Sequence, residues 1–231
     1  MNNTGIRLSK MVWFYIIFYS SYLFLGLRCV FFNLIEEASS VRTLQDRVKE
    51  DGKVIDEQIL KVDSFLNHQI DAKLMHEVGQ VITEHFKEKA ITKVLTIEAS
   101  GIAPAIMAAL HLDVPCLFAK KAKPSTMTSE FYQTDIHSFT KNTTSTVVIS
   151  KQFLDEDDRV LIIDDFLANG EASLGLHRLV QAAQATTSGV AIVVEKSFQP
   201  GRDKLEAEGL ELLSLCQVAS LAGNKVKLVD K

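Results

Sequence analysis

Residues 160–172 read Val160-Leu161-Ile162-Ile163-Asp164-Asp165-Phe166-Leu167-Ala168-Asn169-Gly170-Glu171-Ala172. The apolar residues at the start are typical of a buried parallel strand. Two adjacent carboxylates, Asp164 and Asp165, end that strand, and a loop with Gly170 then enters an Ala/Leu-rich helix. Free N–H groups in the loop and at the helix start favour an anion, helped by the helix dipole. Because carboxylates accept hydrogen bonds from hydroxyl groups, this stretch predicts a cradle for a ribose phosphate.

A plain strand–turn–helix with an acidic N-cap would need no ligand, and for residues 160–172 alone this interpretation stays open. Two consecutive acids at the end of a buried strand count against it. Buried charges are costly unless a partner or a ligand uses them.

Apolar runs on both sides of this stretch alternate with helical patterns. We expect strands at 94–97, 114–119, 146–149, 160–163, 189–194 and 210–215, and helices at 44–49, 71–86, 101–110, 172–183 and 203–208. This alternation predicts an α/β fold with a central parallel sheet and helices on both faces. In such folds ligands bind at the carboxyl ends of the strands.

A second candidate loop, Thr96-Ile97-Glu98-Ala99-Ser100-Gly101-Ile102-Ala103, joins a strand to a helix. Its backbone N–H groups and the Ser100 hydroxyl suit a phosphate-type anion. Ser-Gly before a helix is equally an ordinary helix cap, so the residues alone leave both interpretations open.

The strand, the two acids and the loop Ala168-Asn169-Gly170-Glu171-Ala172 resemble the phosphoribosyl-pyrophosphate (PRPP) motif of type I phosphoribosyltransferases. Asn169 stands where the general motif has Thr, a form similar to the xanthine-using subgroup. The resemblance runs from Val41 nearly to the end of the chain. It includes Leu60-Lys61-Val62-Asp63-Ser64-Phe65-Leu66-Asn67-His68-Gln69 and Ile192-Val193-Val194-Glu195-Lys196-Ser197-Phe198. It implies the type I phosphoribosyltransferase fold, with a small base-binding hood and a flexible loop.

The resemblance also implies roles for the PRPP-binding residues. Asp164 and Asp165 are the catalytic pair and face the ribose hydroxyls, while the second loop, with Ser100 and Gly101, meets the pyrophosphate. The 5-phosphate lies against Ala168, Asn169, Gly170, Glu171 and Ala172. A carboxylate repels a phosphate, so we expect the Glu171 side chain to point outward while its N–H serves the cradle.

Lysines 120, 121 and 123 open a polar segment, residues 120–145. A solvated charge run is the usual meaning of clustered lysines. The alternative is a mobile lid that brings this positive charge to the pyrophosphate and excludes water. The segment resembles the family's flexible loop, which implies Lys120 as a PRPP-binding residue. The family commonly has Arg where Lys120 stands and Ser where Pro124 stands.

Four residues are implied to bind the base. Lys196, which alone would be an ordinary exposed lysine, matches a family lysine that contacts the purine 6-oxo group. Phe198 is placed to stack on the base, and Leu60 and Asn67 cover it. The Asn67 amide can donate to the 2-oxo group of xanthine, where guanine presents an amine.

The implied reaction is transfer of phosphoribosyl from PRPP to N9 of xanthine in purine salvage, giving xanthosine 5'-monophosphate and diphosphate. The resemblance further implies Mg²⁺ bound to the PRPP or pyrophosphate, and a homodimer. Two alternatives stay open: a hypoxanthine/guanine phosphoribosyltransferase, and a regulator that senses PRPP with the same fold.

Charge and cysteine content exclude some classes of function. Residues 1–40 carry a net charge of +1 within a total of −4, which leaves residues 41–231 at −5. The net negative charge of residues 41–231 argues against nucleic-acid binding, and therefore against a PRPP-sensing regulator that binds nucleic acid. The cysteines at 29, 116 and 216 are far apart, so neither a disulfide framework nor a zinc site is predicted.

The first forty residues have a different character from the rest. Met11 to Leu27 carries no charge, and the apolar character continues to Ile35, which is long enough for a membrane-spanning helix. A membrane anchor through residues 11–35, an uncleaved signal, and translated sequence upstream of the true start remain alternatives. The resemblance begins at Val41 and favours the third. We therefore expect a cytoplasmic enzyme domain at 41–231, membrane-bound only if residues 1–40 are expressed.

Overall fold

The computed structural model describes residues 40–230 except 42, 122–129 and 139–142, and its described part forms one compact unit. The expectations for the N-terminal segment, and those for lid residues 122–129 and 139–142, lie outside the described residues. Within the described ranges, no helix is long and apolar enough to cross a membrane.

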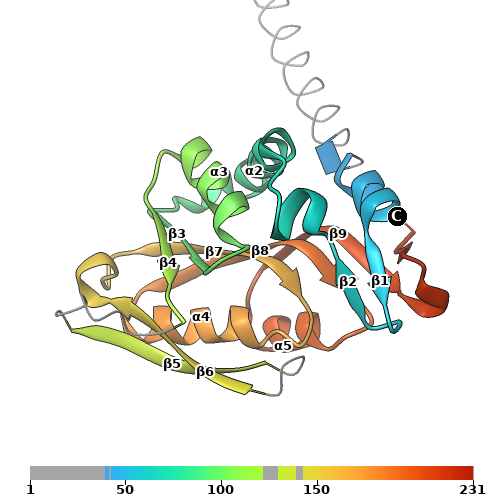
Figure 1. Cartoon of the computed structure of the whole chain (residues 1–231). Helices are drawn as coiled ribbons and strands as arrows, with labels where there is room; N and C mark the ends of the chain where they lie inside the picture. Colours follow the sequence, from blue (N-terminus) through green and yellow to red (C-terminus); the bar gives the residue numbers. More distant parts are fainter. Residues whose placement is uncertain (1–39, 42, 122–129, 139–142, 231) are drawn as a thin grey trace, which may run out of the picture. The chain divides into compact units, whose positions relative to one another are not determined.

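A central sheet confirms the predicted α/β architecture (Figure 1). All neighbouring strands pair in parallel except the last, β10, which is antiparallel to β9. The described strands of this sheet lie in the order β10 (Lys227–Leu228), β9 (Leu212–Ser220), β8 (Thr186–Lys196), β7 (Arg159–Leu167), β3 (Lys93–Ile97) and β4 (Cys116–Ala119).

Helices cover both faces of the sheet, as predicted. One face carries α2 (Ala72–Phe86) and α3 (Ile102–Leu112), and the other carries α4 (Glu171–Ala182) and α5 (Gly201–Ala207). The predicted N-cap of α2 is present, because Asp71 Oδ1 accepts from Leu74 N at 3.1 Å. A further helix covers residues 43–51, and short 3-10 turns cover Lys87–Lys89, Lys151–Phe153 and Ala222–Asn224.

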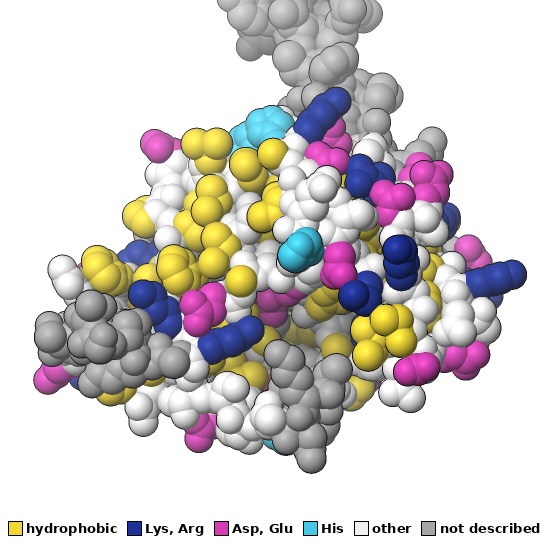
Figure 2. Space-filling view, viewed as in Figure 1, with side chains coloured by type: hydrophobic (Ala, Val, Ile, Leu, Met, Phe, Trp, Pro, Cys, Tyr) yellow, Lys and Arg dark blue, Asp and Glu magenta, His cyan; other side chains and the backbone are white. Residues whose placement is uncertain are grey.

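The outer surface of α3 and β4 is apolar. Ile106 and Leu110, one helical turn apart on α3, are 48% and 68% exposed, and Phe118 of β4 is 37% exposed. Figure 2 shows hydrophobic side chains gathered over the region where Figure 1 places these two elements.

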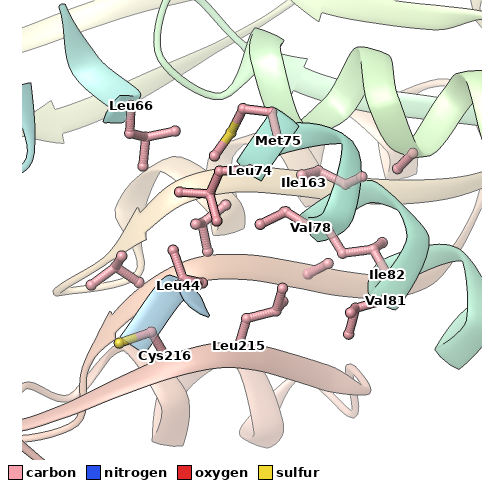
Figure 3. Packing of buried hydrophobic residues seen from close by; sticks show 14 of the residues in the cluster. Leu44, Leu66, Leu74, Met75, Val78, Val81, Ile82, Ile163, Leu215 and Cys216 are labelled. Atoms are coloured by element: carbon pink, nitrogen blue, oxygen red, sulfur yellow. The ribbon is translucent and has the colours of Figure 1, made fainter. Parts of the chain in front are cut away.

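Alternate residues of the central strand β7 fill two separate cores. Leu161 and Ile163 pack with the side chains of α2 and α3, a cluster shown in part in Figure 3. Val160 and Ile162 pack with those of α4 and α5. This alternation is the ordinary consequence of the two-residue period of a strand. It fixes which way the side chains at the strand's carboxyl end point.

A small hood precedes α2 in the chain. It consists of the antiparallel hairpin β1 (Lys53–Ile55) and β2 (Ile59–Lys61), followed by a π-helical turn, Asp63–Asn67. The strands are three residues each, too short to give a two-residue pattern in the sequence. Leu60 and Phe65 anchor the hood in the core on the α2/α3 side.

A long antiparallel hairpin stands where the sequence predicted one short strand at 146–149. It pairs β5 (Phe131–Ser138) with β6 (Thr143–Ser150). Strand β5 was missed because its run, Phe-Tyr-Gln-Thr-Asp-Ile-His-Ser, is largely polar. Ile136 packs in the core beside α4, while Gln133 and Asp135 stay exposed. One buried face was enough to hold a strand that looked like a loop.

Candidate functional site

The segments that follow β3, β4 and β7 meet at a cavity of about 360 Å³. This is the edge of an open α/β sheet at which ligand sites are expected. The loops after β3 and β7 form its wall, and the β5–β6 hairpin contributes further residues. The lining residues are Ile97, Glu98, Ala99, Ser100, Lys121, Ile136, His137, Thr143, Ser145, Val147, Asp164, Asp165, Phe166, Ala168, Asn169, Gly170, Glu171, Ala172 and Ser173.

Asp164 and Asp165 both line this cavity, in unlike surroundings. Asp164 is 3% exposed, and its Oδ1 accepts from the Asp165 backbone N at 3.0 Å. Burial, followed by the charge of Asp165, raises the pKa of Asp164 well above its usual value. Asp165 is more accessible, and its Oδ2 accepts from Asn67 Nδ2 at 2.7 Å. The pair therefore offers hydrogen-bond acceptors near the carboxyl end of β7, although burial makes the charged form of Asp164 unfavourable.

The loop 168–172 enters α4 with its backbone N–H groups ahead of the helix's own bonding. Gly170 adopts φ +82°, a left-handed conformation that glycine accepts without penalty. The bond from Leu174 N to Gly170 O, 2.9 Å, starts the helix, so the preceding N–H groups belong to the unpaired first turn. Ser173 Oγ is buried and has no hydrogen-bond partner among the described residues. This arrangement suits an anion.

Glu171 sits within this loop, and the structure shows what its carboxylate contacts. Its Oε1 lies 2.8 Å from Lys204 Nζ of α5, and the Glu171 side chain is 25% exposed. The carboxylate is thus turned to a lysine and its charge is offset there. Glu171 nevertheless lines the cavity, and its expected use of the backbone N–H for the phosphate stays a prediction.

The loop after β3 approaches Asp164 closely because residue 101 is glycine. A Cβ on Gly101 would lie 2.3 Å from Thr96 Oγ1 and 3.3 Å from Asp164 Oδ1. Ser100 lines the cavity, whereas Gly101 is buried and does not. Glu98 Oε1 accepts from Lys121 N at 2.6 Å, which ties this loop to the end of β4.

Among the described lysines, Lys121 lines the cavity and Lys120 does not. Lys120 forms an antiparallel bridge with Val148 of β6, and its Nζ lies 5.8 Å from the Phe118 ring. Lys121 lines the cavity, and its charge acts on Asp164. Adjacent residues of an extended segment point to opposite sides, so the lysine cluster could not distinguish them.

The four residues expected at the base do not line the cavity. Two of them, Asn67 and Lys196, form hydrogen bonds between the hood and the ends of strands β7 and β8. Asn67, at the end of the hood's π-helical turn, contacts Asp165 as described above. Lys196, at the end of β8, donates to Gln58 O of the β1–β2 turn at 2.9 Å, and burial lowers the pKa of Lys196. Leu60 is a buried core residue of the hood, and Phe198 is 44% exposed. Asn67 and Lys196 therefore both connect the hood to the strand ends.

Several lining residues were not expected from the sequence: Glu98, Lys121, Ile136, His137, Thr143, Ser145, Val147, Phe166 and Ser173. Phe166 lies within the quoted stretch 160–172 and Ser173 directly follows it, so a slightly wider interpretation would have included both. The hairpin residues carry no motif, and only their packing against α4 brings them to the site.

Comparison with known proteins identifies relatives of this chain. A family model described as "Phosphoribosyl transferase domain" matches residues 62–213. Curated xanthine phosphoribosyltransferases from Staphylococcus aureus strains Newman and USA300 are each 72% identical over 188 residues. The match covers 81% of this chain and 98% of each relative.

Solved structures of more distant proteins share the fold. Adenine phosphoribosyltransferase from Rhodothermus marinus superposes with a TM-score of 0.63 at 24% identity, covering 78% of this chain and 99% of that one. The Saccharomyces cerevisiae enzyme gives 0.63 at 21% identity, covering 77% and 99%. At this identity the likeness shows the fold alone.

Proposed function

The chain belongs to the phosphoribosyl transferase domain family and has the type I phosphoribosyltransferase fold, and from this premise we propose that it is a xanthine phosphoribosyltransferase. The reaction joins xanthine N9 to ribose C1 of PRPP and breaks the bond from C1 to the pyrophosphate oxygen. The products are xanthosine 5'-monophosphate and diphosphate.

One observation carries the proposal: the carboxylates of Asp164 and Asp165 line the same cavity as the anion-binding loop 168–172. Ribose hydroxyls donate to the carboxylates, and the 5-phosphate accepts from the loop N–H groups. Ser100 and Gly101 face the pyrophosphate from the loop after β3. Lys121 is better placed than Lys120 to bring a positive charge to it.

Catalysis in this proposal depends on position and charge. As pyrophosphate leaves, positive charge develops at ribose C1, and a nearby carboxylate stabilises that charge in a largely buried site. The loops hold the ribose phosphate while the base is held separately, which makes the attack effectively unimolecular. No covalent nucleophile is required.

The choice of xanthine is supported by the relatives' 72% identity and by the chemistry of two residues. The Lys196 ammonium donates to a 6-oxo group, which disfavours adenine because its 6-amino group is itself a donor. The Asn67 amide donates to a 2-oxo group. Leu60 and Phe198 complete the proposed base site.

Magnesium enters with the substrate in this proposal. Among the described residues, no group of three or more His, Cys, Asp or Glu side chains could hold a metal ion. Mg²⁺ commonly binds through one or two carboxylates together with substrate phosphates and waters, so Asp164 and Asp165 fit it. When bound, Mg²⁺ neutralises charge on the departing pyrophosphate.

Assembly, boundary and location complete the proposal. A homodimer through the apolar surface of α3 and β4 would cover Ile106, Leu110 and Phe118. Residues 41–231 form the enzyme domain. The cytoplasm is the proposed location, because a polyanion such as PRPP does not cross lipid unaided.

A product assay tests the reaction. The purified chain receives PRPP, Mg²⁺ and one of xanthine, guanine, hypoxanthine or adenine, and nucleotide products are separated and measured. We expect xanthosine 5'-monophosphate to form fastest. Asp165→Asn should lower that rate, whereas Asp157→Asn, an exposed acid before β7, should leave it unchanged. A preference for another base would overturn the base assignment, and PRPP binding without any product would favour the regulator.

A further inference from the structure

An ion pair with a buried carboxylate lies directly beside the proposed base-site lysine. Glu195, the residue before Lys196 on β8, is 1% exposed. Arg202 of α5 donates two hydrogen bonds to the Glu195 carboxylate, from Nε to Oε1 at 3.0 Å and from Nη2 to Oε2 at 2.5 Å. This fork geometry restrains direction as well as distance.

The rest of the Glu195 carboxylate is also satisfied. Ser197 Oγ donates to Oε1 at 2.8 Å, and Gln217 Nε2 of β9 donates to Oε2 at 3.3 Å. Burial alone raises the pKa of Glu195, but the bonds from its partners outweigh burial and lower that pKa to about 2. The carboxylate is therefore charged at neutral pH and held from several directions.

Glu195 and Lys196 reach opposite faces of the sheet. Glu195 bonds to α5, whose Leu205 belongs to the core shared with α4. Lys196 bonds to Gln58 O of the hood, whose Leu60 belongs to the core shared with α2 and α3. Consecutive strand residues point to opposite sides, so restraining one carboxylate orients the next side chain.

Helix α5 also contacts the phosphate loop, so it touches both halves of the proposed site. Gly201 N donates to Ala168 O at 3.0 Å, and Lys204 pairs with Glu171. Arg202 itself has a second, outer arm, in which Nη1 contacts the half-exposed Glu206 at 3.0 Å. The inner and outer arms of Arg202 can therefore be tested separately.

We propose that Arg202 and Glu195 are positioning residues for base recognition, which hold the end of β8 so that Lys196 meets the purine 6-oxo group. The inference rests on the proposed function. Neither side chain lines the cavity that holds the proposed PRPP groups, and α5 contacts the phosphate loop through other residues, Gly201 and Lys204. Replacing Arg202 or Glu195 should therefore weaken binding of the base and leave binding of PRPP unchanged. A general structural role would lower both affinities together.

The test compares Arg202→Lys with Glu206→Gln in the full chain. Arg202→Lys keeps the charge but loses the fork, while Glu206→Gln removes the outer arm and leaves the grip on Glu195. For Arg202→Lys we expect the KM for the base to rise about tenfold, as when one charge-assisted hydrogen bond is misaligned, with the KM for PRPP within about twofold. Glu206→Gln should leave both KM values within about twofold of the unmodified chain.

A second variant guards against misfolding. Glu195→Gln keeps the side chain's size and should likewise raise the KM for the base while leaving the KM for PRPP nearly unchanged. A cooperative thermal unfolding transition of this variant shows that it is folded. Equal rises in both KM values, or an unchanged base KM in both folded variants, would overturn the proposal. The base used is whichever purine the unmodified chain turns over fastest. A preference for guanine or hypoxanthine, which also carry a 6-oxo group, would thus count against the proposed substrate without affecting this comparison, whereas a preference for adenine would overturn both.

Discussion

The burial of Asp164 lowers the stability of the folded protein when its carboxyl group is charged. Its carboxylate is almost completely buried beside a second acid, and an arginine or lysine does not pair with it among the described side chains. The raised pKa of Asp164 expresses this cost, since the folded state favours the protonated form. A ligand that donates hydrogen bonds would relieve it.

Replacing Asp164 should therefore stabilise the ligand-free protein while damaging activity. A raised folded pKa contributes stability below the unfolded value of about 4, and that contribution is lost as pH rises through the folded pKa. At pH 8 we expect Asp164→Asn to raise the Tm by about 2–4 °C, equivalent to ~1 kcal/mol. Thermal unfolding at pH 8 and pH 4.5 measures this, and the gain should shrink at pH 4.5.

The same variant should lose about 100-fold or more in kcat/KM. Bound ribose hydroxyls and the positive charge that develops at C1 favour the ionised carboxylate of Asp164, and Asn cannot supply that charge. A Tm equal to or below that of the unmodified chain at pH 8 would contradict the assigned cost of burial.

Gly101 tests how closely the loop after β3 must approach the catalytic pair. Gly101→Ala places a methyl group against Thr96 and Asp164, so we expect a loss of about 1–3 kcal/mol in unfolding free energy. The displaced loop should also lower kcat/KM about tenfold or more. Urea denaturation and steady-state kinetics give the two quantities.

Gly209→Ala is the matched control. Gly209 has φ +73° and nothing within 4 Å of an added Cβ. Its substitution should cost about 1 kcal/mol through backbone strain and leave kcat/KM unchanged. If Gly101→Ala behaved the same way, close approach at residue 101 would not matter for the reaction.

At the scale of elements, the β5–β6 hairpin depends on α4 for its position. Arg178 of α4 donates to Thr134 Oγ1 at 3.1 Å and to Asp135 O at 2.9 Å. Ile136 packs beside Gly175 of α4, and a Cβ added to Gly175 would lie 2.5 Å from Ile136 Cγ1. The hairpin then presents His137, Thr143 and Ser145 to the cavity.

Arg178→Ala should consequently weaken the site more than the fold. We expect an unfolding free energy within about 1.5 kcal/mol of the unmodified chain, since the contacts are exposed hydrogen bonds. The KM for PRPP should rise several-fold in a steady-state assay. Arg159→Ala, which removes an exposed bond to Lys89 O at the far end of β7, should leave that KM unchanged. Equal effects of the two variants would show that the hairpin's anchoring is irrelevant to PRPP.

At the scale of the whole molecule, the apolar surface of α3 and β4 should decide assembly. Leu110→Glu places a charge at its most exposed residue and should convert the proposed dimer to a monomer. Light scattering after size exclusion measures the mass. Ile55→Glu, an exposed apolar position on β1, should leave the mass unchanged. A dimer that survives Leu110→Glu would place the interface elsewhere.

The sequence determined the alternation of strands and helices, the buried strand that carries Asp164 and Asp165, and the glycine loop before α4. It placed the end of that strand too early, because β7 continues through both acids to Leu167 and pairs there with β8. These features arise from neighbours in the chain: an apolar run, two acids, and a residue that accepts positive φ. Their local order predicts strand, loop and helix wherever the segment lies. The resemblance added the reaction, and the relatives support it.

Tertiary structure decided the contacts among distant residues. Asn67 and Asp165 are 98 residues apart in the chain, and Asn67 reaches Asp165 only because the hood packs on the α2/α3 core. Strand β5 became a strand because α4 covers one of its faces, overriding a polar sequence. Pairing with β6 separated the two adjacent lysines, because Lys120 bridges Val148 while Lys121 lines the cavity. Burial and pairing of this kind depend on the packed chain, and no local pattern encodes them.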